Sequence, residues 1–137
     1  KVITVENKAN YESMPYEEVT PIIYSHGYFS PDERAFLIHL ERVLSSIRTS
    51  CGTTYLHTGD LDYGGVKIFQ YIKKRIFPNL QPYLMDTQTH EQYKAYGEPI
   101  ETSKLEKLQR TTEPLLQPLI DKICAEKQVI EQESFLF

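Results

Sequence analysis

The stretch YLHTGDLDYGGVKIFQYI (residues 55–72) places two aspartates, Asp60 and Asp62, between two apolar segments. The first segment is short and favours a strand, whereas the second repeats apolar residues at helical spacing and opens with Gly64-Gly65. A strand that runs through a polar turn into a helix is the repeating unit of a parallel α/β sheet. Two carboxylates this close repel one another, so the turn requires something that offsets the repulsion.

The alternation of strand and helix begins earlier in the chain. KVITV (1–5) and TPIIYS (20–25) are predicted strands because they are short, apolar and rich in β-branched residues. SPDERAFLIHLERVLSSI (30–47) is predicted to be a helix, with Ser30 as N-cap and Glu33 completing a capping box. The apolar stripe of this helix should be formed by Phe36, Leu37, Leu40, Val43, Leu44 and Ile47.

The same pattern continues into the second half of the chain. A helix is expected over about residues 64–77, followed by a fourth strand at LQPYLMD (80–86). The polar segment 87–114 indicates short helices joined by turns, and an amphipathic helix should start at Leu115. The predicted fold is α/β, with a mainly parallel four-stranded sheet, right-handed crossovers and flanking helices.

Length and composition indicate a single globular domain over residues 1–137, in which 87–137 are a mostly helical extension. The net charge of −4 argues against a global field that steers the chain onto nucleic acid. The chain opens on Lys1 without an initiator methionine or signal peptide, so we expect the C-terminal part of a longer protein. No apolar run approaches the roughly 20 residues of a membrane span. Cys51 and Cys124 share no metal spacing and are expected to be reduced thiols of a cytoplasmic protein.

Three carboxylates are expected at one edge of the sheet. Glu6 directly follows the first strand, and Asp60 and Asp62 follow the third. The carboxyl ends of parallel strands meet at one edge, where ligands of such sheets bind. Converging carboxylates raise one another's pKa values unless a cation neutralises them, and hard oxygen ligands suit Mg²⁺ or Mn²⁺. Gly64-Gly65 would let a phosphate approach the backbone at the following helix N-terminus.

Each of these residues also has a purely structural interpretation. A D-x-D pair is most often a solvated turn, and Asp62 is well placed to cap the helix that follows. Glu6, taken alone, is more often a surface residue. The residues by themselves therefore leave a metal site and a structural turn as open alternatives.

VITVEN (2–7) and TGDLDYGGVKI (58–68) resemble the Toprim domain of topoisomerases, primases and some nucleases. That family carries a glutamate after its first strand and D-x-D after its third. With IEQES (130–134), the chain is more similar still to the C-terminal Toprim domains of the Wadjet JetD nuclease family, which is related to topoisomerase VI. The resemblance covers roughly 1–86 and the C-terminal end. Gly64 stands where the longer D-x-D-x-D form has a third aspartate, and the topoisomerase VI relatives also depart from that form there.

The resemblance implies a catalytic and metal-binding role for Glu6, Asp60 and Asp62, the Toprim acidic triad that holds Mg²⁺ or Mn²⁺ against a phosphodiester. Toprim enzymes differ in whether the glutamate binds metal or acts as a general acid/base, so both roles of Glu6 stay open. Glu131 and Glu133 are candidates to complete the metal shell, with solvated charges at a helix end as the alternative.

Three further features carry weaker functional interpretations. Asn7 could orient Glu6 or a phosphate, although ordinary loop polarity is the simpler interpretation. His57 lies three residues before Asp60 and could touch the site, although a histidine satisfied within the sheet is the commoner case. IKKRIF (72–77) could contact a DNA backbone, whereas charge on a solvated helix face is the default.

The resemblance implies the metal-binding catalytic domain of an Mg²⁺-dependent DNA endonuclease in a bacterial plasmid-defence system. Its expected partners are DNA, the other subunits of an SMC-like complex and a second copy of the chain, with no membrane. Two alternatives remain: a topoisomerase VI-like transesterase, whose tyrosine comes from another domain, and a non-catalytic Toprim scaffold that binds DNA or a partner. The isolated chain is expected to bind DNA poorly and to cleave little or nothing.

Overall fold

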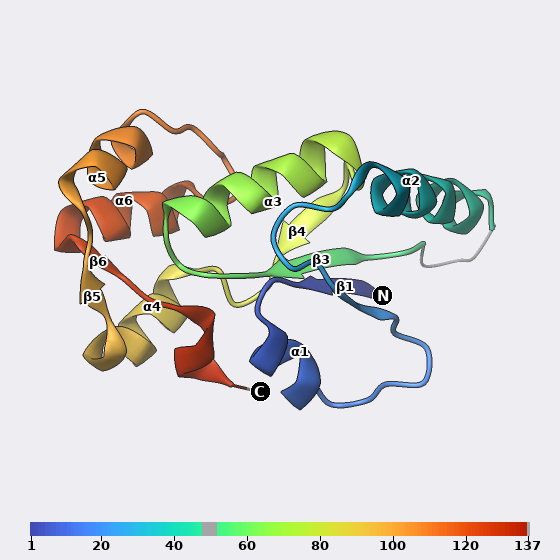
Figure 1. Cartoon of the computed structure of the whole chain (residues 1–137), viewed down its shortest axis with the longest axis horizontal. Coiled ribbons are helices and arrows are strands. Elements are labelled where there is room, and N and C mark those ends of the chain that lie inside the picture. Colours follow the sequence, from blue (N-terminus) through green and yellow to red (C-terminus); the bar gives the residue numbers. More distant parts are fainter. Residues whose placement is uncertain (48–51, 137) are drawn as a thin grey trace.

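A parallel sheet forms the centre of the molecule, which a computed structural model describes for residues 1–47 and 52–136 (Figure 1). The strands are β1 (Val2–Val5), β2 (Ile22–Tyr24), β3 (Tyr55–Thr58) and β4 (Leu80–Pro82), in the spatial order β2-β1-β3-β4. Every neighbouring pair is parallel. β1 is buried along its whole length, as expected for a central strand covered on both faces. The predicted α/β fold is confirmed, and it is consistent with a Rossmann-like Toprim domain.

Helices cover both faces of this sheet. α2 (Pro31–Ser46) and α3 (Tyr63–Arg75) lie on one face, and α1 (Lys8–Ser13) lies on the other (Figure 1). Directly after α3, Phe77 stacks on Tyr55 of β3, with ring centroids 4.6 Å apart. This contact fixes the C-terminal end of α3 against the start of β3, the strand that precedes α3 in the chain.

The apolar stripe of α2 is only partly buried. Its capping box forms as expected, with the Glu33 carboxylate accepting from the Ser30 N–H at 2.7 Å. Leu37 is buried, and two neighbours pack partly buried against the core. The rest of the predicted stripe is exposed, so only part of it packs against the core. The exposed members are Phe36 (63%), Val43 (44%) and Ile47 (52%).

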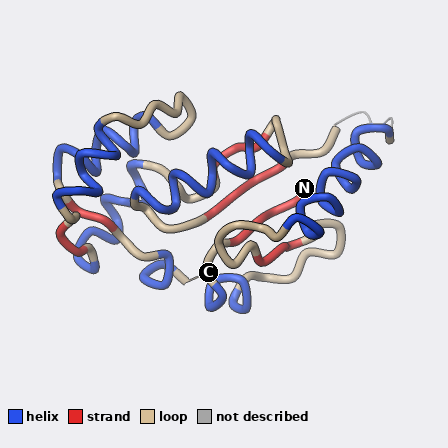
Figure 2. Tube along the Cα trace, turned by 45° about the horizontal axis from the view of Figure 1, so that its top comes forward, coloured by secondary structure: helices blue, strands red, loops and turns tan. Residues whose placement is uncertain are grey.

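The second half of the chain folds back onto the sheet as a set of short elements. These are α4 (Thr87–Tyr93), the 3₁₀ turn η1 (Lys94–Tyr96), β5 (Glu98–Pro99), α5 (Thr102–Gln109), α6 (Gln117–Glu126), β6 (Gln128–Val129) and the 3₁₀ turn η2 (Gln132–Phe135). Buried residues of α6 join the same core as α3. The chain then ends beside α1 (Figures 1 and 2). The last residues therefore return to the region where β1 ends.

Several boundaries differ from those predicted. The fourth strand ends at Pro82, short of the expected end, and Leu84 beyond it has a φ of 55°. The helix expected from Leu115 starts at Gln117, which puts Pro118 in the first turn, where a missing N–H costs nothing. The antiparallel pair of β5 and β6 is absent from the predicted elements because two-residue strands are too short to show a period.

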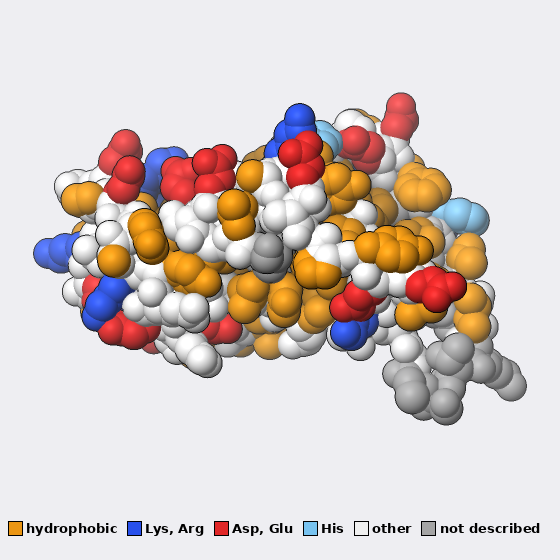
Figure 3. All heavy atoms as spheres, turned by 90° about the horizontal axis from the view of Figure 1, so that it is seen from below, with side chains coloured by type: hydrophobic (Ala, Val, Ile, Leu, Met, Phe, Trp, Pro, Cys, Tyr) orange, Lys and Arg blue, Asp and Glu red, His pale blue; other side chains and the backbone are white. Residues whose placement is uncertain are grey.

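Three surface features bear on the expectations from sequence. Across the described residues, no helix is both long and apolar enough to cross a membrane. Cys124 is a free, half-buried cysteine whose thiol pKa is raised by burial, and Cys51 lies outside the described residues. Apolar side chains gather over much of the face that carries α1 (Figure 3).

Candidate functional site

The acidic residues meet at the carboxyl-end edge of the sheet. Glu6 lies just beyond β1, and Asp60 and Asp62 lie just beyond β3, which pairs directly with β1. The Glu6 carboxylate reaches across the edge, and its Oε2 accepts a hydrogen bond from the Asp60 backbone N–H at 3.2 Å. The structure therefore brings the three predicted carboxylates to one edge.

The C-terminal segment joins this edge at Leu61, the residue between the two aspartates. The Leu61 N–H donates to the Ile130 carbonyl at 2.9 Å, and the Ile130 N–H donates back at 3.2 Å, as an isolated antiparallel bridge. Both side chains are buried in the core. The bridge brings Glu131 and Glu133, which are exposed, close enough for their charges to act on Asp60.

Gln132, which sequence reasoning overlooked, ties these segments together. Its fully buried side chain accepts at Oε1 from the Asn7 N–H at 3.0 Å and donates from Nε2 to Thr58 Oγ1 at 2.9 Å. Its backbone N–H donates to Asp60 Oδ1 at 2.7 Å. One residue thus connects the ends of β1 and β3 to the C-terminal segment. Only its place within the IEQES motif could have drawn attention to it, because a single glutamine has no informative spacing.

Asn7 caps α1, which accounts for its position without a ligand. Its Oδ1 accepts from the N–H groups of Ala9 and Asn10 at 2.8 and 3.3 Å. Its Nδ2 donates to Glu133 Oε1 at 2.9 Å. Among the described residues, Asn7 therefore orients Glu133, not Glu6.

Asp62 is the N-cap of α3, as its structural interpretation predicts. Its Oδ1 accepts from the Gly65 N–H at 2.7 Å. Gly65 is required by a close approach, because a Cβ at this position would overlap the backbone carbonyl oxygen of Asp60. At Gly64 the nearest atom to an added Cβ is Asp62 Oδ1, at 3.3 Å. The glycine pair thus shapes the turn, and a role in phosphate binding stays a prediction.

Burial and neighbouring negative charge raise the pKa values of two carboxylates at this edge, Glu6 and Asp60. Burial, followed by the negative charge of Asp60, raises the pKa of Glu6 from 4.5 to about 8. Burial also raises the pKa of Asp60 from 3.8 to about 6, with a further contribution from the neighbouring carboxylates. Within residues 1–47 and 52–136, no Lys or Arg forms an ion pair with any of these groups. The edge therefore carries negative charge that no protein cation balances.

The chemistry of these donors fits a divalent ion of the magnesium type. In their hydrogen bonds to the described backbone, Asp60 and Asp62 use Oδ1 and Glu6 uses Oε2, so each carboxylate keeps its second oxygen for a ligand. In the described part of the chain, however, no three His, Cys, Asp or Glu side chains are arranged so that they could hold a metal ion. Metal binding would require the carboxylates to draw closer together.

His57 lies behind this edge, inside the sheet. It is fully buried, and its Nδ1 lies 2.8 Å from Thr4 Oγ1. Burial lowers the pKa of the ring to about 3, so it is neutral at physiological pH. Its Nε2 has no hydrogen-bond partner among the described residues and faces Gly59, where a Cβ would lie 3.2 Å from Nε2 and would overlap the Glu6 carboxylate. Gly59 thus separates the histidine from Glu6.

Comparison with known proteins assigns the chain to a family. A sequence model of the family described as "Wadjet protein JetD, C-terminal" matches residues 1–137. The chain belongs to the JetD C-terminal family. It is 33% identical over 141 residues to the Wadjet protein JetD of Bacillus cereus (strain Q1). That alignment covers 96% of the chain and 32% of the relative, so the chain spans about a third of the relative's length. The family match includes the segment 87–128, where the motifs alone show little resemblance.

Gly65→Ala should lower the free energy of unfolding by about 2 kcal/mol or more, because the new methyl group overlaps the Asp60 carbonyl oxygen and displaces the turn. Gly64→Ala is the matched control, since its methyl group would meet only the Asp62 side chain, at 3.3 Å, which need shift by only a few tenths of an ångström, and alanine favours a helix by up to about 1 kcal/mol. Urea denaturation of the two variants measures the difference. Equal losses in both variants would contradict the close approach assigned to Gly65.

Gln132→Leu should cost about 2–4 kcal/mol of unfolding free energy, because it leaves the Asn7 N–H and the Thr58 hydroxyl unpaired in a buried place. The exposed neighbour provides the control, and Glu131→Gln should change stability by no more than about 0.5 kcal/mol. Thermal unfolding monitored by circular dichroism tests both. A Gln132→Leu variant as stable as the parent would show that Gln132 does not hold the edge.

The stability of the metal-free chain should fall as the pH rises from about 6.5 to 8. Over this range the unfolded Glu6 is already ionised while the folded one still holds a proton, so the folded state binds more protons and a higher pH disfavours it. Below about pH 6.5 the buried, neutral His57 opposes this trend, because the unfolded chain protonates that ring and the folded chain does not. Glu6→Gln should flatten most of the slope in melting temperature against pH. A parent protein whose stability is constant from about pH 6.5 to 8 would contradict the burial assigned to Glu6.

Proposed function

We propose that the chain is the Mg²⁺- or Mn²⁺-binding catalytic part of a DNA endonuclease that acts in bacterial defence against plasmids. The observation that carries this proposal is the gathering of Glu6, Asp60 and Asp62 at one sheet edge, without a balancing cation among the described residues, in a chain of the JetD family. Such an edge raises the electrostatic free energy of the folded chain unless it binds a cation. Selection for stability alone would not retain this cluster of carboxylates.

The chain's own residues prepare the proposed site. The Gln132 N–H holds Asp60 and the Gly65 N–H holds Asp62, so that one oxygen of each carboxylate is fixed and the other is free for a ligand. A bound Mg²⁺ or Mn²⁺ would stabilise charge on the attacking and leaving oxygens of a phosphodiester. The raised pKa of Glu6 suits both roles left open by the sequence: a ligand once ionised, or a general acid while protonated. Glu131 and Glu133 would extend the metal shell.

We also propose that the chain is the C-terminal part of a longer cytoplasmic protein, since it matches only a third of its Bacillus cereus relative. The proposed partners are DNA, the other subunits of the defence complex and a second copy of the chain. A separate part of the longer protein would supply whatever this chain lacks for cleavage, which is why the isolated chain is expected to cleave little.

A second candidate is a non-catalytic scaffold, which the structural duties of the same carboxylates favour. Asp62 caps α3, and Asp60 anchors the C-terminal segment through Gln132. In that case the acidic edge stabilises the turn, and DNA or a protein binds elsewhere. The two candidates differ in what neutralising Asp60 does to activity and to stability.

In the complete protein that contains this chain, Asp60→Asn and Glu6→Gln should each reduce Mg²⁺-dependent nicking of circular DNA by at least about a hundredfold. Both amides can still accept the backbone hydrogen bonds, and loss of a charge relieves repulsion, so the metal-free melting temperature should hold or rise. Mn²⁺ should raise the melting temperature of the parent but not of the variants. Gel analysis of supercoiled plasmid and thermal unfolding are the two measurements.

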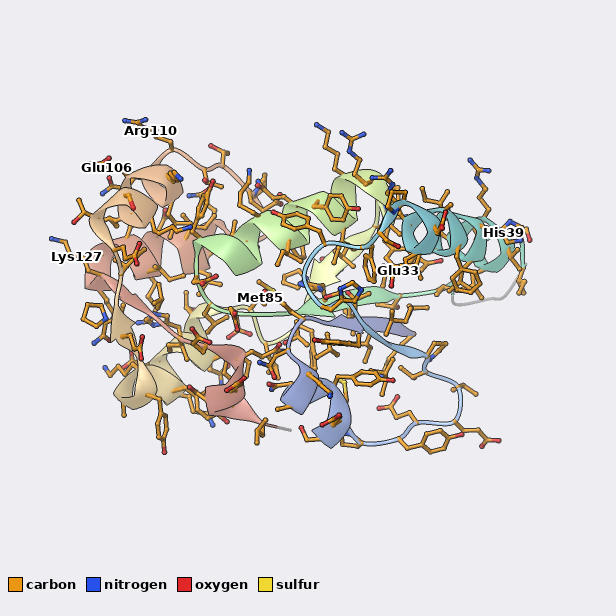
Figure 4. All side chains as sticks on the ribbon, in the orientation of Figure 1. Glu33, His39, Met85, Glu106, Arg110 and Lys127 are labelled. Atoms are coloured by element: carbon orange, nitrogen blue, oxygen red, sulfur yellow. The ribbon has the colours of Figure 1, made fainter. Side chains whose placement is uncertain are left out.

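Glu106→Gln is the matched control, because this exposed glutamate lies at the end of the molecule formed by α5 and α6 (Figure 4). It should nick DNA as the parent does. Nicking that survives in Asp60→Asn while its melting temperature falls would overturn the catalytic proposal and favour the scaffold. Cleaved DNA that stays covalently attached to the protein would instead identify a transesterase.

A further inference from the structure

The part of α3 from Lys67 to Arg75 lines a hollow that is rich in positive charge. The hollow has a volume of about 740 Å³, and its lining includes Lys67, Lys73, Lys74 and Arg75. Four of the 15 Lys and Arg residues of a chain with net charge −4 thus gather around one depression. We call it the basic hollow. Its cations Lys73, Lys74 and Arg75 lie in the last turn of α3, at the end away from Asp62, whereas Lys67 lies five residues after Asp62.

Lys73 is the cation of the basic hollow that the fold uses, because its Nζ donates to the Pro78 carbonyl oxygen at 2.8 Å. Within the described residues, Lys67, Lys74 and Arg75 take part in none of the ion pairs, whereas Lys94 and Lys122 elsewhere are paired with glutamates. The buried Glu113 at the rim does not balance them, because one carboxylate stands against four cations and, among the described residues, forms no ion pair with any of them. The helix dipole favours cations only in the last turn of α3 and does not explain Lys67, two turns earlier.

An aromatic pair stands beside these cations. Tyr28 and Tyr71 meet edge to face, with ring centroids 5.0 Å apart, and Tyr28 is 55% exposed. The Tyr71 hydroxyl donates to the Phe29 carbonyl at 3.2 Å, which fixes the ring. Lys67, Tyr71 and Lys74 follow one another at helical spacing along the same face of α3. An exposed ring and a half-buried ring beside cations that form no ion pair among the described residues make a surface that suits a sugar-phosphate backbone.

We propose that the basic hollow binds the phosphodiester backbone of duplex DNA, as a contact separate from the acidic edge. The rise from Lys67 to Lys74 is about 10 Å, which matches about three base-pair steps of one strand. Along α3 from Asp62, Lys67 lies at about 7 Å and Arg75 at about 20 Å, which correspond to about two and about six base-pair steps. A duplex that lies along α3 therefore reaches both ends. This alignment rests on the proposed function, whereas binding at the hollow does not.

The hollow also offsets the repulsion that the acidic edge exerts on DNA. Five carboxylates at that edge and a net charge of −4 disfavour a polyanion until cations are bound. Contacts made by Lys67, Lys74 and Arg75 release counterions from the phosphates and hold the duplex without metal. A basic surface of this kind explains how an acidic chain can approach its substrate.

The test measures binding of the 137-residue chain to a fluorescent 15-base-pair duplex in EDTA, by anisotropy over a range of salt concentrations. The parent should bind with a Kd on the order of 10–100 μM at low salt. The triple variant Lys67→Gln/Lys74→Gln/Arg75→Gln should bind at least about tenfold more weakly, and the slope of log K against log salt should fall in magnitude by about 2–3.

The control variant Lys94→Gln/Arg110→Gln/Lys127→Asn removes the same charge. Arg110 and Lys127 lie at the α5–α6 end of the molecule (Figure 4), and asparagine tolerates the φ of 55° at residue 127. This control should bind within about twofold of the parent. Equal weakening of DNA binding in both triple variants would show that only the net charge matters, and this would overturn the proposal. A hollow variant that binds DNA as tightly as the parent would also overturn it.

Two further arms separate this inference from its alternatives. Asp60→Asn should bind DNA in EDTA at least as well as the parent, so loss of nicking with retained binding keeps the two proposals distinct. If neither the parent nor any variant nicks DNA but the hollow variant still loses DNA binding, the proposed nuclease function is wrong and the DNA-binding role of the basic hollow is supported. Polyglutamate should compete much less well than duplex DNA at equal charge concentration. Equal competition would point to an acidic protein partner and overturn the assignment to DNA.

Discussion

The buried side chain of Gln132 is the interaction on which the acidic edge depends. β1 and β3 end side by side, and both would leave polar groups at the rim of the core. Gln132 pairs with the Asn7 N–H, the Thr58 hydroxyl and the Asp60 carboxylate at once. A buried polar group left unpaired costs about 1–3 kcal/mol, so this network strongly prefers one position of the C-terminal segment. The bridge between Leu61 and Ile130 then fixes that position along the chain.

The edge combines a structural and an electrostatic task. Each carboxylate of the proposed site accepts a backbone N–H, which determines where it points and offsets part of its burial. Burial, and then the repulsion that remains, raises the pKa values of Glu6 and Asp60. A site whose carboxylates are oriented by backbone contacts and disfavoured by their own charges is predisposed to a cation. The same contacts explain how the scaffold alternative arises from the same residues.

Charge is distributed along α3 in a way that net charge conceals. The N-terminal end of the helix faces the carboxylates, and its C-terminal end carries the basic hollow. The overall value of −4 therefore describes neither end. A protein with this arrangement can repel DNA on average and still hold its backbone at one place, because screening confines each field to about 10 Å at ordinary salt.

The sequence by itself determined the order of strands and helices, the capping box of α2 and the meeting of Glu6 with Asp60 and Asp62. These follow from local periodicity, and from the rule that parallel strands end at a common edge. Tertiary structure alone decided that Gln132 ties the edge together, that Asn7 orients Glu133 and that part of the α2 stripe is exposed. Such outcomes depend on contacts between residues far apart in the chain, and on which surface each helix finds opposite it. Neither leaves a periodic trace in the sequence, so only the folded chain reveals them.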